Sequence, residues 1–201
     1  MDQSRIENRM NDTDKLLVLL AGQSNMAGRG YVGPDDLTAI PNLLMIRPDG
    51  KWQPAVEPIT RDRAFIGTFQ ASGEKIVGSD PFETVLPQGG QKVVGVGLGR
   101  TFGRLLAEAN PGRTVGLIPC AVGGTSIAAW MPGGVDDWDP NNYPYDNAVK
   151  KAREAQKSGK IVAAVRQVFG MHATERGVFR RQFSQRTVDD TDMRSDPLRI
   201  K

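Results

Sequence analysis

Ser24 stands in the segment Gly22-Gln23-Ser24-Asn25-Met26, three residues after a short apolar run that ends at Ala21. In open parallel sheets, functional sites form beyond the carboxyl ends of the strands, where loops meet helix N-termini. A serine there exposes its hydroxyl and keeps its own N–H free, beside the unpaired N–H groups of the next helix's first turn. Such a position suits attack on a carbonyl and stabilisation of the resulting oxyanion. Capping of that helix is the alternative role for Ser24.

Alternating strand-like and helix-like segments must hold this serine in place. Buried parallel strands read as short continuous apolar runs, because helices cover both faces of their sheet. Helical spacing of apolar or alanine residues predicts helices at residues 100–110 and 145–157. The expected strands are residues 16–21, 43–46, 51–58 (a short edge strand), 93–97, 114–118 and 161–165. This alternation predicts a three-layer α/β/α sandwich around a parallel sheet, flavodoxin-like in outline, whose completeness at the C-terminus is left open.

The overall composition excludes several classes of protein. With 201 residues, 39% of them hydrophobic and 24% charged, the chain has the composition of one globular domain rather than of a disordered or fibrous protein. A net charge of +3 is too small to indicate a nucleic-acid partner. No apolar run approaches the roughly 20 residues that span a bilayer, and the N-terminus lacks the apolar core of a secretory signal. We therefore expect a cytoplasmic protein with no membrane partner.

The chain divides into three parts. Residues 1–14 are polar and predict a disordered leader, and residues 15–165 carry the patterned domain. Residues 166–201 contain seven arginines and few apolar residues, which predicts an atypical, arginine-rich tail. Within the domain, residues 60–91 are rich in Gly, Ser, Asp and Pro and predict a long surface excursion. Cys120 is the only cysteine, so the chain forms no intrachain disulfide.

Two blocks of the sequence resemble a known family. Residues 22–30, Gly-Gln-Ser-Asn-Met-Ala-Gly-Arg-Gly, are similar to the first signature block of the SGNH-hydrolase superfamily. Within that superfamily they are most similar to the branch of sialate O-acetylesterase-like proteins and family 6 acetylxylan esterases. Residues 119–127, with Trp130 following, are similar to the Gly-Gly-Thr segment of the same branch. Both blocks follow an expected strand in the family's order, and the resemblance covers about residues 15–165.

The resemblance implies a carbohydrate O-acetylesterase that works through a serine acyl-enzyme and needs no metal or nucleotide cofactor. Ser24 would attack the acetyl carbonyl, and its N–H would form part of an oxyanion hole with that of Gly123 or Gly124. A residue without Cβ lets the backbone approach a substrate closely, although a plain tight turn is the alternative for this pair. For contacts with the acetylated carbohydrate, the resemblance implies Gln23, Asn25, Thr125 and Trp130.

The machinery that the resemblance implies is incomplete after residue 165. The family continues with a Gln-Gly-Glu block, whose glutamine is a further oxyanion donor, and later with an Asp-x-x-His motif, whose histidine is the general base. Neither motif occurs in this chain. His172 is the only histidine and hence the only candidate base, although its neighbours do not match the motif; a chance histidine in the tail is the alternative. Loss of one triad member costs about four to six orders of magnitude in rate.

Three hypotheses about function remain at this stage. The first is an active acetylesterase, and the second is a non-catalytic carbohydrate-binding remnant that keeps the pocket without the base. The third is an inert, poorly folded truncation product. The abrupt change of composition at residues 165–169 further suggests a shifted reading frame or a truncated variant, which sequencing of the encoding DNA tests.

Two further patterns have alternative interpretations. The turn Gly95-Val96-Gly97-Leu98-Gly99 is similar to a dinucleotide-binding turn, but the next strand ends without the acidic residue that binds the ribose hydroxyls. The loop at residues 130–145 concentrates aromatic residues and aspartates, which either contact sugar rings or hold the loop in place. Aspartates scattered without a Cys/His cluster do not predict a metal site.

Overall fold

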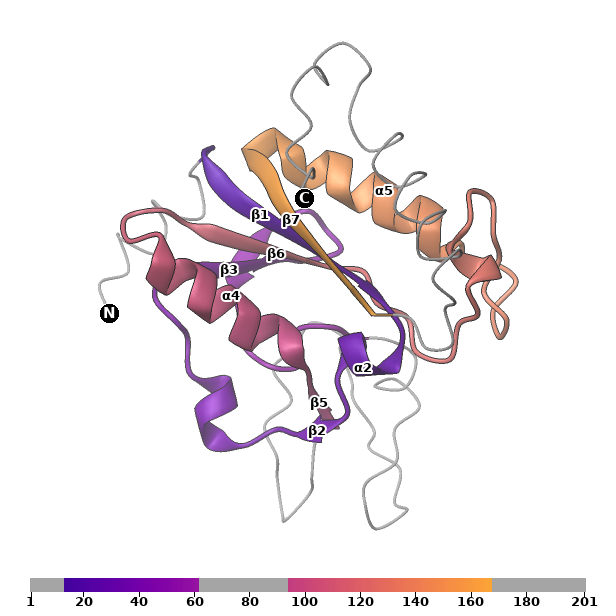
Figure 1. Ribbon diagram of the computed structural model, residues 1–201, viewed down its shortest axis with the longest axis horizontal. Helices are drawn as coiled ribbons and strands as arrows, with labels where there is room; N and C mark the ends of the chain where they lie inside the picture. The colour runs from indigo at the N-terminus through magenta and orange to yellow at the C-terminus, as the bar shows by residue number, and fades with distance from the viewer. Residues whose placement is uncertain (1–12, 62–93, 168–201) are drawn as a thin grey trace, which may run out of the picture.

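The structure is a computed structural model that describes residues 13–61 and 94–167. One β-sheet lies between two helical layers, with α5 on one face and α4 and α2 on the other (Figure 1). The three-layer α/β architecture expected from the sequence is therefore confirmed. The helices are α2 (Ser24–Ala27), α4 (Leu98–Ala109) and α5 (Pro144–Ala155), with 3₁₀ turns η1 (Pro34–Leu37), η2 (Ala128–Trp130) and η3 (Gln156–Ser158).

The central sheet has the strand order β4-β3-β6-β1-β7. β1 pairs in parallel with β6 and β7, and β3 pairs in parallel with β6. The edge strand β4 runs antiparallel to β3, because a turn at residues 47–51 reverses the chain. The sheet is thus mixed, and the expectation of a parallel sheet is wrong at this edge. The strands are β1 (Lys15–Gly22), β3 (Leu43–Ile46), β4 (Trp52–Pro54), β6 (Val115–Pro119) and β7 (Gly159–Gln167).

β1 is apolar from Leu16 to Ala21 because both of its faces are covered. Leu17 and Leu19 belong to the core cluster on the α5 side, together with the small residues that α5 presents to the sheet. Val18 and Leu20 belong to the cluster on the α4 side. Each of these four leucine and valine side chains is at most 1% exposed. This two-sided burial explains why the strand reads as a continuous run rather than as an alternating pattern.

The glycine-rich segment before α4 has a packing role. β5 (Val94–Val96) does not join the central sheet as expected; it pairs antiparallel with β2 (Gly30–Tyr31) in a separate two-stranded sheet. Gly28 has a φ of 95°, and a Cβ placed on it would lie 2.6 Å from the backbone N of Gly97. Glycines at these positions let the backbone after α2 touch the backbone before α4. Close backbone packing therefore accounts for the Gly-x-Gly spacing that resembled a nucleotide-binding turn.

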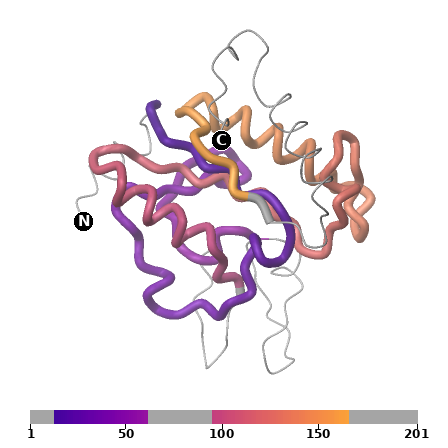
Figure 2. The backbone as a smooth tube through the Cα atoms, viewed as in Figure 1, coloured from indigo at the N-terminus to yellow at the C-terminus, as the bar shows by residue number. Residues whose placement is uncertain are grey.

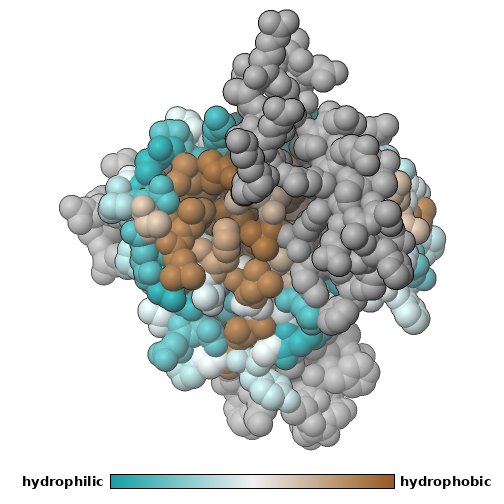
Figure 3. All heavy atoms as spheres, in the orientation of Figure 1, coloured by the Kyte–Doolittle hydropathy of each residue, from teal (hydrophilic) through white to brown (hydrophobic). Residues whose placement is uncertain are grey.

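The face of the molecule that carries α4 is rich in apolar residues (Figure 3). On this side of the sheet α4 packs on β6 and β3, and α2 packs on β1 and β7. The tube trace in Figure 2 follows the same arrangement along the chain. No helix in residues 13–61 and 94–167 is long and apolar enough to cross a membrane. The half-buried apolar residues that pack against the α4-side cluster are Leu16, Ile40, Phe102, Leu106, Ala163 and Val165.

Several expectations fall on residues outside the described ranges. These are the disordered leader except for its last two residues, nearly all of the excursion at residues 60–91, and the arginine-rich tail beyond Gln167. His172 also lies outside the described residues.

Replacement of Gly28 by alanine tests the close contact between the two backbone segments. We expect Gly28→Ala to lower the free energy of unfolding by about 4 kcal/mol or more, because the methyl group would meet backbone that has no room to move. The matched control is Gly112→Ala. Gly112 has a similar φ of 87° but no heavy atom within 4 Å of an added Cβ, so this variant should lose only about 1–2 kcal/mol. Urea denaturation measures both losses, and equal losses would contradict the packing role.

Candidate active site

Ser24 is the first residue of α2, immediately beyond the carboxyl end of the central strand β1. The strand ends at Gly22, whose φ of 137° turns the chain, and Gln23 occupies the N-cap position. The N–H groups of Met26 and Ala27 both donate to the carbonyl oxygen of Gln23. Ser24 is thus positioned by the end of a buried strand, as the sequence predicted, and is half-buried.

The polar groups of Ser24 are available for chemistry. Its carbonyl oxygen accepts the N–H of Gly28, but neither its hydroxyl nor its own N–H has a hydrogen-bond partner within the described part of the chain. Gln23 provides no side-chain cap to α2. Because Ser24 follows the N-cap instead of occupying it, helix capping does not explain a serine here.

The second block of the family resemblance lies beside the first. Two backbone hydrogen bonds extend the pairing of β6 with β1 beyond Pro119: Cys120 N–H donates to Leu20 O, and Val122 N–H donates to Gly22 O, each at 2.8 Å. Gly123 and Gly124 therefore begin one residue after a contact with Gly22, which is itself two residues before Ser24. The structure brings the two blocks together at one end of the sheet.

The Gly123-Gly124 pair forms a turn that the buried side chain of Thr125 supports through hydrogen bonds. The Thr125 hydroxyl donates to Val122 O at 2.8 Å and accepts the indole N–H of Trp130 at 2.9 Å. Gly124 has a φ of 78°, which favours glycine, and its N–H has no partner among the described residues. Thr125 and Trp130 are both 0% exposed. This burial does not support the substrate contacts expected for these two residues; they support the turn.

The other two expected contact residues differ in exposure. Asn25 is exposed on α2, and Gln23 is half-buried at the N-cap position. Both remain next to Ser24 in the chain. Their expected contacts with a carbohydrate stay predictions.

Gln167 is a residue that sequence reasoning missed. The expected last strand ended at Val165, but β7 continues two residues further and pairs Gln167 with Gly22. The end of a third strand therefore reaches the end of β1 that carries Ser24. In the sequence, a single glutamine that is not followed by Gly-Glu does not match the family's Gln-Gly-Glu block, and only its register with Gly22 distinguishes it.

Glu57 is a buried carboxylate beneath this end of the molecule. It is 1% exposed, and it accepts the N–H of Ile59 at 2.8 Å and the N–H of Gly97. Its own N–H donates to Asp36 O. Burial raises the pKa of Glu57 from its ordinary value of 4.5 to about 7, although the two backbone N–H groups and the charge of Arg100 oppose this rise. Glu57 thus ties the segment after β4 to the N-terminus of α4, whose Gly97 touches Gly28.

For the loop at residues 130–145, the sequence left open whether the side chains contact sugar rings or hold the loop in place. The structure contains aspartates that hold the loop and an aromatic side chain that is largely exposed. The Asp136 carboxylate accepts the N–H of Trp138 and the side-chain amide of Asn142, and the Asp137 carboxylate accepts the N–H of Ser126. The bond from Ser126 lowers the pKa of Asp137. These aspartates hold the loop in place. Trp138 differs, because its side chain is 74% exposed.

A cavity of about 740 Å³ lies beyond the ends of β3 and β6 and is bounded by this loop and by α5. Its lining includes Trp138, Lys151 and the chain just before the glycine pair at residues 119–122. Cys120 belongs to this lining, and burial raises the pKa of its thiol to about 11. The thiolate is therefore scarce at neutral pH, and Cys120 is not a nucleophile of this site.

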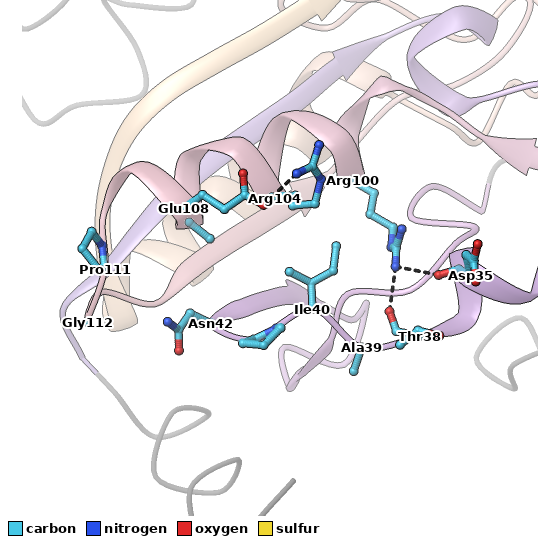
Figure 4. A pocket seen from close by; sticks show the side chains of 12 residues that line it. Asp35, Thr38, Ala39, Ile40, Asn42, Arg100, Arg104, Glu108, Pro111 and Gly112 are labelled. Carbon is cyan, nitrogen blue, oxygen red and sulfur yellow. Dashed lines mark hydrogen bonds and ion pairs between the residues drawn. The ribbon is translucent and has the colours of Figure 1, made fainter.

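A second cavity, of about 640 Å³, lies between α4 and residues 35–42 (Figure 4). The guanidinium of Arg100 donates to the carbonyl oxygens of Asp35 and Thr38, and Arg104 forms an ion pair with Glu108. These charged side chains interact with other residues that line the cavity. Among the described residues, no group of three or more His, Cys, Asp or Glu side chains is arranged to hold a metal ion.

Comparison with known proteins connects this geometry to a family. Residues 14–176 match the family model described as carbohydrate esterase, sialic acid-specific acetylesterase. Over 165 residues the chain is 28% identical to a probable carbohydrate esterase of Arabidopsis thaliana, At4g34215, and the match covers 74% of this chain and 51% of that protein. The chain thus spans about half the length of this curated relative.

Two solved structures share the fold. The X-ray structure of the Arabidopsis protein At4g34215 matches with a TM-score of 0.54 and 22% identity, over 87% of this chain and 68% of that one. The crystal structure of NanS matches with a TM-score of 0.51 and 16% identity, over 88% of this chain and 65% of that one.

Substitution of Thr125 tests its support of the glycine turn. Thr125→Val keeps the shape but removes the hydroxyl, and with it the hydrogen bonds to Val122 O and from the indole N–H of Trp130. We expect the free energy of unfolding to fall by about 1–3 kcal/mol, the usual cost of a buried polar group left unpaired. Thr125→Ser keeps the hydroxyl and should lose less. Thermal denaturation distinguishes the two variants, and a Val variant as stable as the Ser variant would contradict this role.

Protonation of Glu57 predicts a dependence of stability on pH. Because the folded protein raises the pKa of Glu57 from 4.5 to about 7, it holds a proton that the unfolded chain has released. The stabilisation is therefore complete below about pH 4.5 and is lost as the pH rises to about 7, with a total of roughly 3 kcal/mol. Glu57→Gln should remove this dependence, whereas the exposed control Glu108→Gln should keep it. Urea denaturation between pH 4.5 and 8 measures the slopes, and equal slopes in all three proteins would be evidence against it.

Proposed function

Because the chain belongs to the sialic acid-specific acetylesterase family of carbohydrate esterases, we propose that it is a serine esterase that removes acetyl groups from a carbohydrate, with Ser24 as the nucleophile. The observation that carries this proposal is the position of Ser24 beside the Gly123-Gly124 turn, with a hydroxyl and an N–H that have no partner among the described residues. The chain spans only about half of its Arabidopsis relative, so the activity is inferred from the site as well as from the family.

The reaction has two steps. The Ser24 hydroxyl oxygen adds to the acetyl carbonyl carbon while its proton passes to a base, and the sugar oxygen leaves with a proton to give an acetyl-serine. Water then adds to the same carbonyl, acetate leaves, and the serine hydroxyl is restored. Each addition places a negative charge on the carbonyl oxygen, which must be stabilised.

Two backbone N–H groups are assigned to that oxygen. They are those of Ser24 and Gly124, which come from the two strand ends joined by the Val122-to-Gly22 hydrogen bond. One such donor typically contributes about 3 kcal/mol to stabilisation of the transition state. The position of Gln167 opposite Gly22 makes it our candidate for the glutamine of the family's third block.

The proposed reaction needs a general base that accepts the proton of the Ser24 hydroxyl. None of the described residues is a histidine, and His172 is the only imidazole in the chain. A serine without a base is a poor nucleophile. This observation favours a second candidate function, in which the chain binds an acetylated carbohydrate and turns it over slowly or not at all.

Hydrolysis of p-nitrophenyl acetate tests the role of Ser24. We expect Ser24→Ala to reduce the protein-dependent rate by about 10³-fold or more, because it removes the attacking oxygen. The matched control is Thr13→Ala, which removes the hydroxyl of an exposed residue just before β1, at the opposite end of the strand from Ser24.

The outcomes of this assay separate the two candidate functions. Equal rates for the unmodified chain and Ser24→Ala would overturn the esterase proposal. If the two hydrolysis rates are equal and the chain still binds an acetylated glycan, the chain is a binding protein. A rate that falls in Ser24→Ala and not in Thr13→Ala supports the esterase.

A further inference from the structure

Trp138 is the most exposed large apolar side chain among the described residues. Its side chain is 74% exposed, whereas Trp130 on the same loop is 0% exposed. Tryptophan is strongly buried on average in folded proteins, because its indole carries a large apolar area. An indole left in solvent at the end of a sheet that carries a candidate nucleophile therefore requires an explanation.

The exposed indole is held in one orientation. Its N–H donates to the carbonyl oxygen of Gly124 at 3.1 Å, and its backbone N–H donates to the Asp136 carboxylate at 2.9 Å. Asp136 is itself 4% exposed and accepts the Asn142 side-chain amide as well. A side chain fixed at both its backbone and its ring loses little conformational entropy when a ligand packs on it.

The fixed indole contacts the Gly123-Gly124 turn and also lines the cavity. It rests on Gly124, where an added Cβ would lie 3.3 Å from the indole nitrogen. Trp138 also lines the cavity of about 740 Å³ beyond β3 and β6. A ligand lying on the indole would therefore have the Gly123-Gly124 turn on one side and the cavity on the other.

The cavity also offers a polar group, the ammonium of Lys151. The ammonium group of Lys151 donates to Pro119 O at 2.7 Å, and its other two donors have no partner within residues 13–61 and 94–167. Sugars present an apolar face of C–H groups and a rim of hydroxyls. An aromatic face with a few convergent polar groups is the combination that such ligands require.

We propose that Trp138 is the platform on which the sugar ring of the substrate stacks, with the rim of the sugar in the cavity that Lys151 lines. This inference rests on the proposed function for its substrate class, and it assigns sugar contact to one residue of the loop at residues 130–145, for which the sequence left two roles open. Stacking on Trp138 places the sugar next to the turn that would hold the acetyl oxygen. Trp138 then determines affinity for the carbohydrate and leaves the chemistry of the acetyl group unchanged.

Binding without turnover tests the platform. In the Ser24→Ala background, titration with N-acetylneuraminic acid should change the tryptophan fluorescence in a saturable way, because Trp138 is the exposed indole among the three tryptophans. Trp138→Ala in the same background should weaken binding by at least ~10-fold, measured by calorimetry. Acetate, the sugar-free product, should give no response.

Two variants serve as controls for the loss of binding. Tyr143→Ala removes an aromatic side chain that is 41% exposed on the same loop and does not line the cavity, so it should bind as the parent does. Trp138→Phe keeps an aromatic face but loses the bond to Gly124 O, and it should retain binding within ~3-fold. Thermal denaturation checks that each variant is folded.

The outcomes decide the proposal independently of the esterase assay. Unchanged binding in Trp138→Ala overturns it, as does the absence of a saturable response in the Ser24→Ala parent up to about 50 mM sugar. A Phe variant that binds as weakly as the Ala variant also overturns it, because the ring face would then not be the determinant. Because the titration needs no turnover, failure of p-nitrophenyl acetate hydrolysis affects only the proposed function.

Discussion

Pairing between β1 and β6 is the interaction on which the candidate site depends. The two parallel strands continue to exchange backbone hydrogen bonds after β6 ends, from Cys120 to Leu20 and from Val122 to Gly22. These bonds fix the register between the segments that follow the two strands, which are Gln23 and α2 after β1 and the glycine turn after β6. Because a slip of one residue would turn every side chain of a strand to the opposite face, the two-sided core holds this register firmly. The relative position of Ser24 and Gly124 is thus set by the core of the sheet.

Small residues and a few buried polar groups hold the segments around the candidate site in fixed positions. Gly28 and Gly97 let the segment after α2 rest on the segment before α4. Glu57 then binds the N–H of Gly97 and ties in the segment that follows β4. On the other loop, Thr125 supports the glycine turn from within the core. Within the described residues, the Ser24 hydroxyl and the N–H groups of Ser24 and Gly124 have no hydrogen-bond partner.

Much of the fold was predictable because two-sided burial marks strands directly in the sequence. The apolar runs at β1, β3 and β6 predicted strands, and the position of Ser24 after β1 predicted the end of the sheet that carries the site. The direction of β4 and the separation of β5 were not predictable, because turn geometry and backbone contact decide them. Exposure was the other missing information: Trp130 and Trp138 look alike in sequence, yet one is entirely buried and the other lies open. Gln167 became visible only through its register with Gly22.

The long range of the central pairings has a consequence for how the molecule folds. Leu16 pairs with Val115 and with Lys160, so each pairing closes a loop of about 100 residues or more. Closing such a loop costs chain entropy before the contacts that stabilise it have formed. The neighbouring strands β3 and β4 close only a short turn. The β3–β4 hairpin therefore costs less chain entropy to form than the pairings that join the strand ends of the site. The candidate site is accordingly assembled by pairings between segments that lie about 100 residues or more apart in the chain, so it depends on the most distant contacts of the sheet.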